Sequence, residues 1–213
     1  MKLYSFFNSS ASYAVRIALN LKGLAYDIVP VNIRAGEQRA PDFLGEVSAS
    51  PAVPALVDGG VNLSQSLAII DWLEATYPSV VLIPHDKTKR ARVLEITYAI
   101  SSDIRPVNNL RILKYLQTEL GLSDTQKGAW YKHWIAEGME VVERLLQASA
   151  DLYCVGDAPT LADCCLIPQI AGALRMGCDM TPYAKSMEVY DRAMQTDAFA
   201  RARPDAQPDF LSP

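Results

Sequence analysis

The sequence contains no apolar run of the roughly 18 residues that a membrane-spanning helix needs. Its opening residues, MKLYSFF, lack the long apolar core and small-residue cleavage site of a signal peptide. A surplus of basic residues is also missing, because 20 lysines and arginines stand against 24 acidic residues, for a formal net charge of −4. These absences predict a cytoplasmic protein that binds neither membranes nor nucleic acid.

Cysteine is scarce, and all four cysteines lie in the C-terminal half, at positions 154, 164, 165 and 178. Their spacing fits no zinc pattern, and adjacent cysteines rarely bridge each other, so no metal site is expected. We interpret them as small, reduced core residues of a cytosolic protein. A redox switch is the less favoured alternative.

Half of the 213 residues are hydrophobic, which is enough to form a hydrophobic core. Residues 1–78 read as a β-α-β-α-β-β-α domain, in which the polar stretch 34–50 holds one short helix and Gly59-Gly60 joins the two strands of a hairpin. The expected strands cover 2–7, 26–33, 55–58 and 61–63, and the two main helices cover 11–22 and 66–77.

Residues 79–87 form a linker, and residues 88–213 read as all-helical. Long helices are expected over 89–116 and 125–149, with shorter ones over 160–176 and 186–195. The spacing of Thr160 and Asp163 predicts a capping box at the start of the third helix. The fold class is therefore an α/β N-terminal domain followed by an all-α C-terminal domain.

Serines crowd the start of the first helix, where the sequence reads Asn8-Ser9-Ser10-Ala11-Ser12. Ser10 and Ser12 are predicted to start and cap the helix, because hydroxyl oxygens accept hydrogen bonds from first-turn amides. Ser9 and Ser12 have the i, i+3 spacing of a thioredoxin Cys-x-x-Cys motif, but neither is cysteine. Dithiol chemistry is therefore impossible at this position.

Two further stretches have residue types whose position before a strand or a helix would suit ligand binding. Pro54 directly precedes a predicted strand, and in the cis form it would expose the backbone of Val53 to an extended peptide lying alongside. An ordinary loop proline is equally compatible with the local sequence. Gln65 and Ser66 begin the next helix, where they would cap it or, with its free amides and dipole, hold a carboxylate. Capping is the commoner use.

Taken together, these features resemble the zeta class of soluble glutathione transferases, which includes the maleylacetoacetate and maleylpyruvate isomerases. The resemblance covers nearly the whole chain. It implies a thioredoxin-like N-terminal domain, an all-helical C-terminal domain, glutathione as cofactor, a small-molecule substrate and a homodimer. The stretches that carry it are 9–12 with 15–19, 53–54, 65–70, 103 with 106–109, 153–157, 160–163 with 166–169, 179–183 and 207–209.

The resemblance assigns catalysis to Ser9, which would hydrogen-bond the glutathione sulfur and favour its thiolate, with Ser10 close by. It also implies that the backbone of Val53, beside a cis Pro54, pairs with the cysteinyl unit of glutathione. Because this chain has no cysteine of its own at the helix start, the thiol must come from the bound cofactor.

Other cofactor contacts follow from the same resemblance. Gln65 and Ser66 would hold the γ-glutamyl carboxylate, and Gln38 would contact the glycyl end. Asp103 and Asn108 would lie near the active site at the dimer interface.

The chain departs from the family where the substrate is expected to bind. Asn8 and Ala14 stand where zeta enzymes usually have arginine, and Ala11 stands where they usually have cysteine. The expected substrates are dianions, whose carboxylates favour bidentate guanidinium partners. Arg175 remains where the maleylpyruvate branch has a substrate arginine.

Substrate contacts are therefore predicted at Asn8 and Arg175, with Arg111 or Arg105 as local replacements for the missing arginines. A solvated helix face is an equal alternative for Arg111. The resemblance implies a glutathione-dependent cis–trans isomerase of a maleyl keto-acid in aromatic catabolism. The alternatives are a zeta-like transferase that conjugates or dehalogenates small electrophiles, and a glutathione-binding protein without isomerase activity.

Overall fold

The computed structural model describes residues 1–210 and divides the chain into two compact units. Among the described residues, unit 1 contains Met1–Leu82 together with residues 194–210, and unit 2 contains Ile83–Ala193. Sequence analysis places the last residues in the helical domain, whereas their packing groups them with the N-terminal unit. This grouping brings residues 198–209 to the first helix and to the turn after the first strand.

Unit 1 is built on a four-stranded mixed sheet with the order β2-β1-β3-β4. β1 pairs parallel with β2 and antiparallel with β3, and β3 pairs antiparallel with β4. This confirms the predicted thioredoxin-like domain, although the first two strands are shorter than expected. The strands are Lys2–Ser5 (β1), Asp27–Pro30 (β2), Ala55–Asp58 (β3) and Val61–Ser64 (β4).

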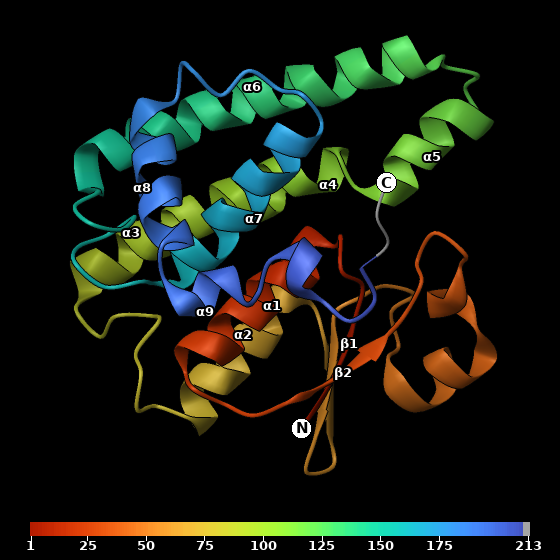
Figure 1. Ribbon diagram of the computed structural model, residues 1–213, viewed down its shortest axis with the longest axis horizontal. Coiled ribbons are helices and arrows are strands. Elements are labelled where there is room, and N and C mark those ends of the chain that lie inside the picture. Colours follow the sequence, from red (N-terminus) through yellow and green to blue (C-terminus); the bar gives the residue numbers. More distant parts are fainter. Residues whose placement is uncertain (211–213) are drawn as a thin grey trace. The chain divides into compact units, whose positions relative to one another are not determined.

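Two helices, α1 (Ser10–Leu21) and α2 (Ser66–Thr76), pack together on one side of the sheet, as Figure 1 shows. Their buried apolar side chains form the core with the sheet. On the other side, the polar stretch after β2 holds two short helical turns rather than one, Glu37–Arg39 and Phe43–Val47.

Gly59 and Gly60 form the predicted hairpin between β3 and β4, in which Asp58 pairs with Val61. Both glycines have positive φ, 54° and 87°. A two-residue loop with this geometry is a type I′ turn, whose twist matches that of the flanking strands.

The expected continuous helix over 89–116 is wrong. α3 (Lys87–Tyr98) runs into a π-helical segment, Ala99–Ile104, followed by the single turn α4 (Arg105–Val107) and then by α5 (Leu110–Thr118). Pro106 lacks a backbone donor, and the side chain of Asn109 accepts a hydrogen bond from the Arg111 N–H, which starts a new helix.

The remaining helices of unit 2 agree more closely with expectation. They are α6 (Asp124–Ser149), α7 (Leu161–Arg175) and α8 (Ala184–Met194), the last of which ends at the boundary with unit 1. The capping box at Thr160 is confirmed, since the fully buried Asp163 carboxylate accepts from the Thr160 N–H at 2.7 Å. The same carboxylate holds the Cys154 N–H at 2.9 Å, so it joins α7 to the preceding loop.

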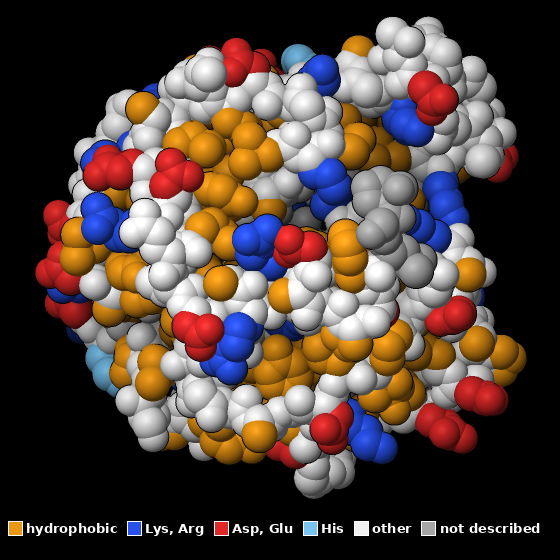
Figure 2. Space-filling view, in the orientation of Figure 1, with side chains coloured by type: hydrophobic (Ala, Val, Ile, Leu, Met, Phe, Trp, Pro, Cys, Tyr) orange, Lys and Arg blue, Asp and Glu red, His pale blue; other side chains and the backbone are white. Residues whose placement is uncertain are grey.

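Three of the four cysteines are buried thiols in unit 2, as interpreted from the sequence, and Cys178 is partly exposed. Burial raises the pKa of the Cys154 and Cys165 thiols, which makes them poor nucleophiles. Across residues 1–210, no helix has both the length and the apolar character required to cross a bilayer. Figure 2 shows acidic and basic side chains scattered among hydrophobic ones over the face in view.

Candidate functional site

The predicted site residues of unit 1 gather at one edge of its sheet because of the strand register. Tyr4 near the end of β1 lies opposite Ala55, the first residue of β3, and Ala55 lies opposite Ser64, the last residue of β4. The turn after β1, the residues before β3 and the residues after β4 therefore emerge at the same edge. These are the segments that carry Ser9, Val53-Pro54 and Gln65-Ser66.

Ser9 is the N-cap residue of α1. Its Oγ accepts a hydrogen bond from the Ser12 N–H at 3.2 Å, and its own N–H donates to the Phe6 carbonyl at 3.0 Å. Ser10 starts the helix as predicted, but the prediction that Ser10 and Ser12 cap it is wrong, because Ser9 is the cap and the buried Ser12 hydroxyl has no hydrogen-bond partner among residues 1–210. The cap is the residue whose backbone is still extended.

The geometry of Ser9 leaves its hydroxyl proton available. An Oγ that accepts from one amide can still donate its O–H to a second group. Ser9 is half-buried and sits at the positive end of the α1 dipole, where first-turn amides have no partner within the helix. This arrangement favours an anion beside the Ser9 hydroxyl. Asn8 and Ser10, also half-buried, flank it directly.

Val53 is buried in an apolar cluster beneath this edge, and the Val53–Pro54 peptide bond is cis, as the sequence allowed. The other buried members of the cluster are Phe6, Phe7, Val31, Phe43 and Ala55. Arg34 stacks over two of these rings, with its guanidinium 5.5 Å from the centroid of Phe6 and 5.6 Å from that of Phe7. The edge of the sheet that carries the predicted site residues is therefore supported by a packed apolar cluster.

Gln65 precedes α2 in an unusual conformation, with φ 72° and ψ 114°, and is the only non-glycine among residues 1–210 with positive φ. Its side chain is exposed and makes no capping hydrogen bond, so the prediction that Gln65 caps the helix is wrong. A strained backbone of this kind costs roughly 1–3 kcal/mol and concentrates at ligand sites. The half-buried Ser66 follows as the first residue of α2.

Gln38 lies in the short helical turn Glu37–Arg39 and is buried. Its Oε1 has no hydrogen-bond partner within the described part of the chain. A buried amide oxygen without a partner is costly, which makes Gln38 a candidate ligand contact.

The predicted site residues of unit 2 have separate surroundings. Asp103 is exposed on the π-helical segment Ala99–Ile104, and Arg111 is exposed in the first turn of α5. Arg105 is already engaged, because its guanidinium donates to the Cys165 carbonyl at 2.9 Å. Of the two arginines considered as local replacements, Arg111 is the one left at the surface.

Asn108 contacts Tyr131 of α6, a residue that sequence reasoning missed, and the charge of Arg175 acts on the Tyr131 hydroxyl. The Asn108 side chain donates to the Tyr131 carbonyl at 3.2 Å, and its Oδ1 is buried without a partner among the described residues. Burial raises the pKa of the Tyr131 hydroxyl to about 12, and the positive charge of Arg175 opposes this rise. Tyr131 therefore stays protonated near neutral pH, and nothing in the local sequence distinguishes it from other tyrosines.

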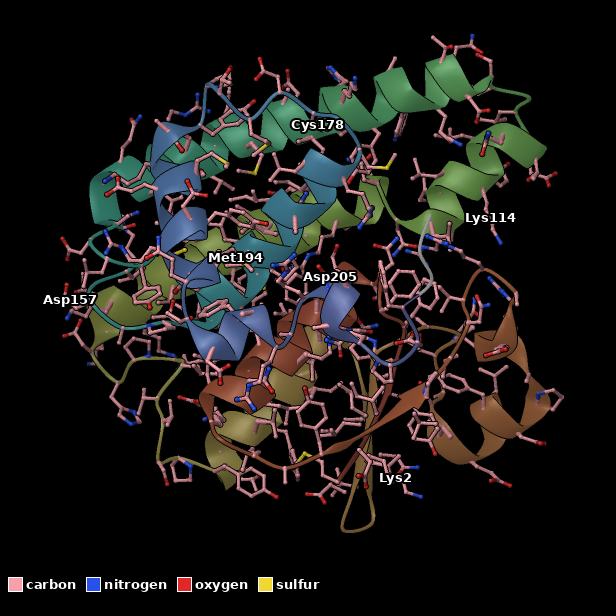
Figure 3. All side chains as sticks on the ribbon, in the orientation of Figure 1. Lys2, Lys114, Asp157, Cys178, Met194 and Asp205 are labelled. Atoms are coloured by element: carbon pink, nitrogen blue, oxygen red, sulfur yellow. The ribbon has the colours of Figure 1, made fainter. Side chains whose placement is uncertain are left out.

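A cavity of ≈ 260 Å³ also lies in unit 2, between α6 and the turn after α7. Cys178 lies there beside α6 (Figure 3), and burial raises the pKa of its thiol while Lys132 opposes the rise. None of the residues predicted for the site lines this cavity, whose walls are Lys132, Ile135, Ala136, Gly177, Cys178 and Asp179.

Comparisons with known proteins agree with this architecture. Residues 1–75 match the family model described as the glutathione S-transferase N-terminal domain. The chain is 43% identical to a probable maleylacetoacetate isomerase of Vibrio cholerae, with 97% of each chain covered. It is 42% identical to the maleylpyruvate isomerase of a Ralstonia species, with 98% of this chain and 99% of that protein covered.

Solved structures give the same picture. A holo structure of a bacterial zeta-class maleylpyruvate isomerase matches with a TM-score of 0.96 at 42% identity, covering 99% of this chain and 100% of that one. A maleylacetoacetate isomerase of Methylobacterium extorquens, solved with malonate and glutathione bound, matches with a TM-score of 0.95 at 36% identity, and both chains are covered completely.

Proposed function

This chain belongs to the zeta class of glutathione transferases, the family of the maleylacetoacetate and maleylpyruvate isomerases, and from that premise we propose that it is a glutathione-dependent cis–trans isomerase of a maleyl keto-acid. The observation that carries the proposal is the position of the Ser9 hydroxyl. It lies at the start of α1 with its proton free to donate, at the sheet edge shared with Val53 and Gln65.

Ser9 would act on the cofactor thiol. A free thiol has a pKa of about 8.5, so near neutral pH only a few per cent is thiolate. A hydroxyl that donates to sulfur stabilises the anion selectively, and so do the helix N-terminal amides. With Ser10 beside it, Ser9 would hold glutathione as the nucleophile that the chain itself lacks.

Other residues would hold the rest of glutathione. The backbone of Val53, next to Pro54, would pair with the cysteinyl unit, and Gln65 with Ser66 would bind the γ-glutamyl carboxylate. Gln38 would contact the glycyl end through its buried amide. Each of these groups is supported by its position at the site edge or by an unsatisfied polar atom.

Asp103 and Asn108 of unit 2 would complete the cofactor contacts near the interface of a homodimer. The homodimer and a cytoplasmic location are proposed from the family. For Asn108, the support is its buried Oδ1 atom, which has no partner among residues 1–210.

The reaction would proceed by addition and elimination. The thiolate adds to the cis double bond of the conjugated keto-acid, and the electron pair moves onto the carbonyl oxygen to give an enolate. Rotation about the resulting single bond follows, and collapse of the enolate expels the thiolate and leaves the trans double bond. Glutathione is regenerated, so the protein's contribution is electrostatic: it keeps sulfur anionic and stabilises the enolate.

Arg175 would bind a substrate carboxylate, since a guanidinium is always charged and matches a carboxylate bidentately. Arg111 is the second candidate, because it is exposed, whereas Arg105 is engaged by Cys165. Asn8 is uncharged, so it would contact the substrate by hydrogen bonding alone. Unit 1 would therefore offer the substrate less positive charge than a zeta enzyme with arginine at this position.

The single experiment that tests the proposal follows the absorbance of maleylpyruvate with and without glutathione. We expect turnover that depends on glutathione without consuming it. If maleylpyruvate and maleylacetoacetate are both unchanged while a model electrophile such as dichloroacetate reacts, the chain is a zeta-like transferase instead. The replacement of arginine by Asn8 is the observation that favours this second candidate. Glutathione binding without any turnover would indicate a non-catalytic binding protein.

Replacing Gln65 by glycine should separate stability from cofactor binding. Glycine adopts positive φ without strain, so Gln65→Gly should raise the free energy of unfolding by about 1 kcal/mol. Loss of the side-chain amide should weaken glutathione binding about tenfold. Thermal melts and titration calorimetry measure the two effects.

Gln65→Ala is the matched control for Gln65→Gly, because it removes the same amide and keeps a Cβ in the strained conformation. It should weaken glutathione binding equally without raising stability. Unchanged affinity in both variants would remove Gln65 from the site.

A further inference from the structure

Arg16 of α1 is a fully buried charged side chain that the proposed reaction does not use. Its Nη2 donates to the Phe7 carbonyl at 3.0 Å, its Nη1 to Ser5 Oγ at 3.0 Å, and its Nε to the Ala202 carbonyl at 3.0 Å. Burial lowers the pKa of the guanidinium to about 10, and Tyr26, Tyr13 and Asp209 oppose this shift. Arg16 therefore stays charged at neutral pH and joins the end of β1 to Ala202 in the C-terminal segment.

Asp209 contacts the same turn as Arg16. Its Oδ2 accepts a hydrogen bond from the Phe7 N–H at 2.8 Å. Both backbone polar groups of Phe7 are thus held by charged side chains, the N–H by Asp209 and the carbonyl by Arg16. The Phe7 ring also packs edge-on against Phe210, with centroids 5.5 Å apart.

The residues from 194 to 210, here called the C-terminal strap, lie along α1. Asn20 of α1 donates to the Ala198 carbonyl at 2.9 Å, and α9 (Asp197–Ala200) packs on α1 (Figure 1). Gln207 folds the strap on itself, because its Nε2 donates to the carbonyls of Arg201 at 2.9 Å and Arg203 at 2.7 Å. The strap is thereby shaped to present Asp209 to the Phe7 amide.

We propose that the C-terminal strap is a positioning element for Ser9, acting through Asp209 and Arg16 on the turn from Phe6 to Ser9. The Ser9 N–H donates to the Phe6 carbonyl, so the turn that fixes Ser9 is the turn whose Phe7 groups the strap holds. Asp209 is a positioning residue, since it acts through this backbone. The inference rests on the proposed role of Ser9 in holding the glutathione thiolate.

Positioning matters here because a hydrogen bond weakens steeply when its angle or length departs from the optimum. A shift of about 1 Å in a catalytic group can cost on the order of 100-fold in rate. Among residues 1–210, the hydrogen-bond partner of the Ser9 hydroxyl is the Ser12 amide, so the direction of its proton depends on the turn before it.

The test titrates the thiol of bound glutathione by its ultraviolet absorbance in the full-length protein, alongside kcat and KM. Asp209→Ala frees the Phe7 amide, so the apparent pKa of the bound thiol should rise by about one pH unit, and the smaller thiolate fraction should lower kcat at neutral pH by up to about tenfold. Asp209→Asn keeps an oxygen that can accept from Phe7, so its upward shift should be smaller.

Asp205→Asn is the matched control. Asp205 is exposed on the same strap (Figure 3) and pairs with Arg203 at 2.6 Å, so this variant removes the same charge without touching Phe7. It should show the wild-type thiol titration and the wild-type kcat.

The outcomes separate the possible roles of Asp209. A lower melting temperature in Asp209→Ala with an unchanged thiol titration would make the strap purely structural and overturn the inference. An equal downward shift in Asp209→Ala and Asp209→Asn would show a direct charge effect and also overturn it. If Asp209→Ala does not fold, the Asp209→Asn titration decides, and no upward shift there rejects positioning. Failure of the unchanged protein to bind glutathione would instead reject the proposed function, and the inference with it.

Discussion

Ser9→Ala should lower kcat by about 100-fold while glutathione affinity changes far less. The hydroxyl is the one side-chain donor assigned to the sulfur, and loss of one donor that stabilises an anion typically costs on the order of 100-fold or more. The tripeptide keeps its contacts to Val53, Gln65 and Ser66, so its binding should persist. Initial rates and titration calorimetry measure the two effects.

Ser9→Ala also removes the N-cap of α1, which costs about 1 kcal/mol of stability, so rates should be compared well below the melting temperature. Ser9→Thr keeps both the cap and the hydroxyl and should retain most of the turnover. Ser12→Ala makes the same change three residues away, at a buried hydroxyl with no partner in the described part of the chain, and should be nearly neutral. Full activity in Ser9→Ala would exclude Ser9 from the mechanism.

Gly138→Ala should destabilise unit 2 by about 1–3 kcal/mol, because it overpacks a helix contact. A Cβ at this position of α6 would lie 2.6 Å from Ile104 Cδ1 and closer still to Ile104 Cγ1. Ile104 is almost completely buried, so it has little room to move away. Chemical denaturation followed by circular dichroism measures the change.

Gly128→Ala provides the control for Gly138→Ala on the same helix. A Cβ at Gly128 meets no atom within 4 Å, so alanine should raise stability by up to about 1 kcal/mol through its better helix propensity. In an Ile104→Ala background the added methyl at 138 has space, and its cost should largely disappear. Equal effects of alanine at 128 and 138 would contradict the predicted clash.

Sequence signals between neighbouring residues were sufficient to predict much of the secondary structure of the N-terminal unit. Gly59-Gly60 predicted the hairpin because only positive φ closes a two-residue loop with the right twist. The capping box at Thr160 and Asp163 was predicted correctly for a similar reason, since its partners are three residues apart. Family resemblance supplied the thioredoxin-like fold and pointed to the segments that meet at the site edge.

Predictions were wrong where local signals compete. The stretch 89–116 has helical periodicity, yet it is divided because Pro106 has no N–H to donate to a continuous helix and the Asn109 side chain caps a new one. At the first helix, each of three serines, Ser9, Ser10 and Ser12, is of a residue type that can cap a helix. Ser9 is the one whose backbone remains extended, a choice set by the turn that ends β1.

The sequence by itself determined the local chemistry of this protein: where its helices can be capped, where its chain can turn, and that its site offers a hydroxyl where a redox protein has a thiol. Only the tertiary structure decided that Asp209 holds the amide of Phe7, and that Gly138 must lack a side chain beside Ile104. The physical reason is the separation in sequence between the interacting residues. Caps and turns depend on residues a few positions apart, whereas these contacts join distant segments that meet only when their unit packs.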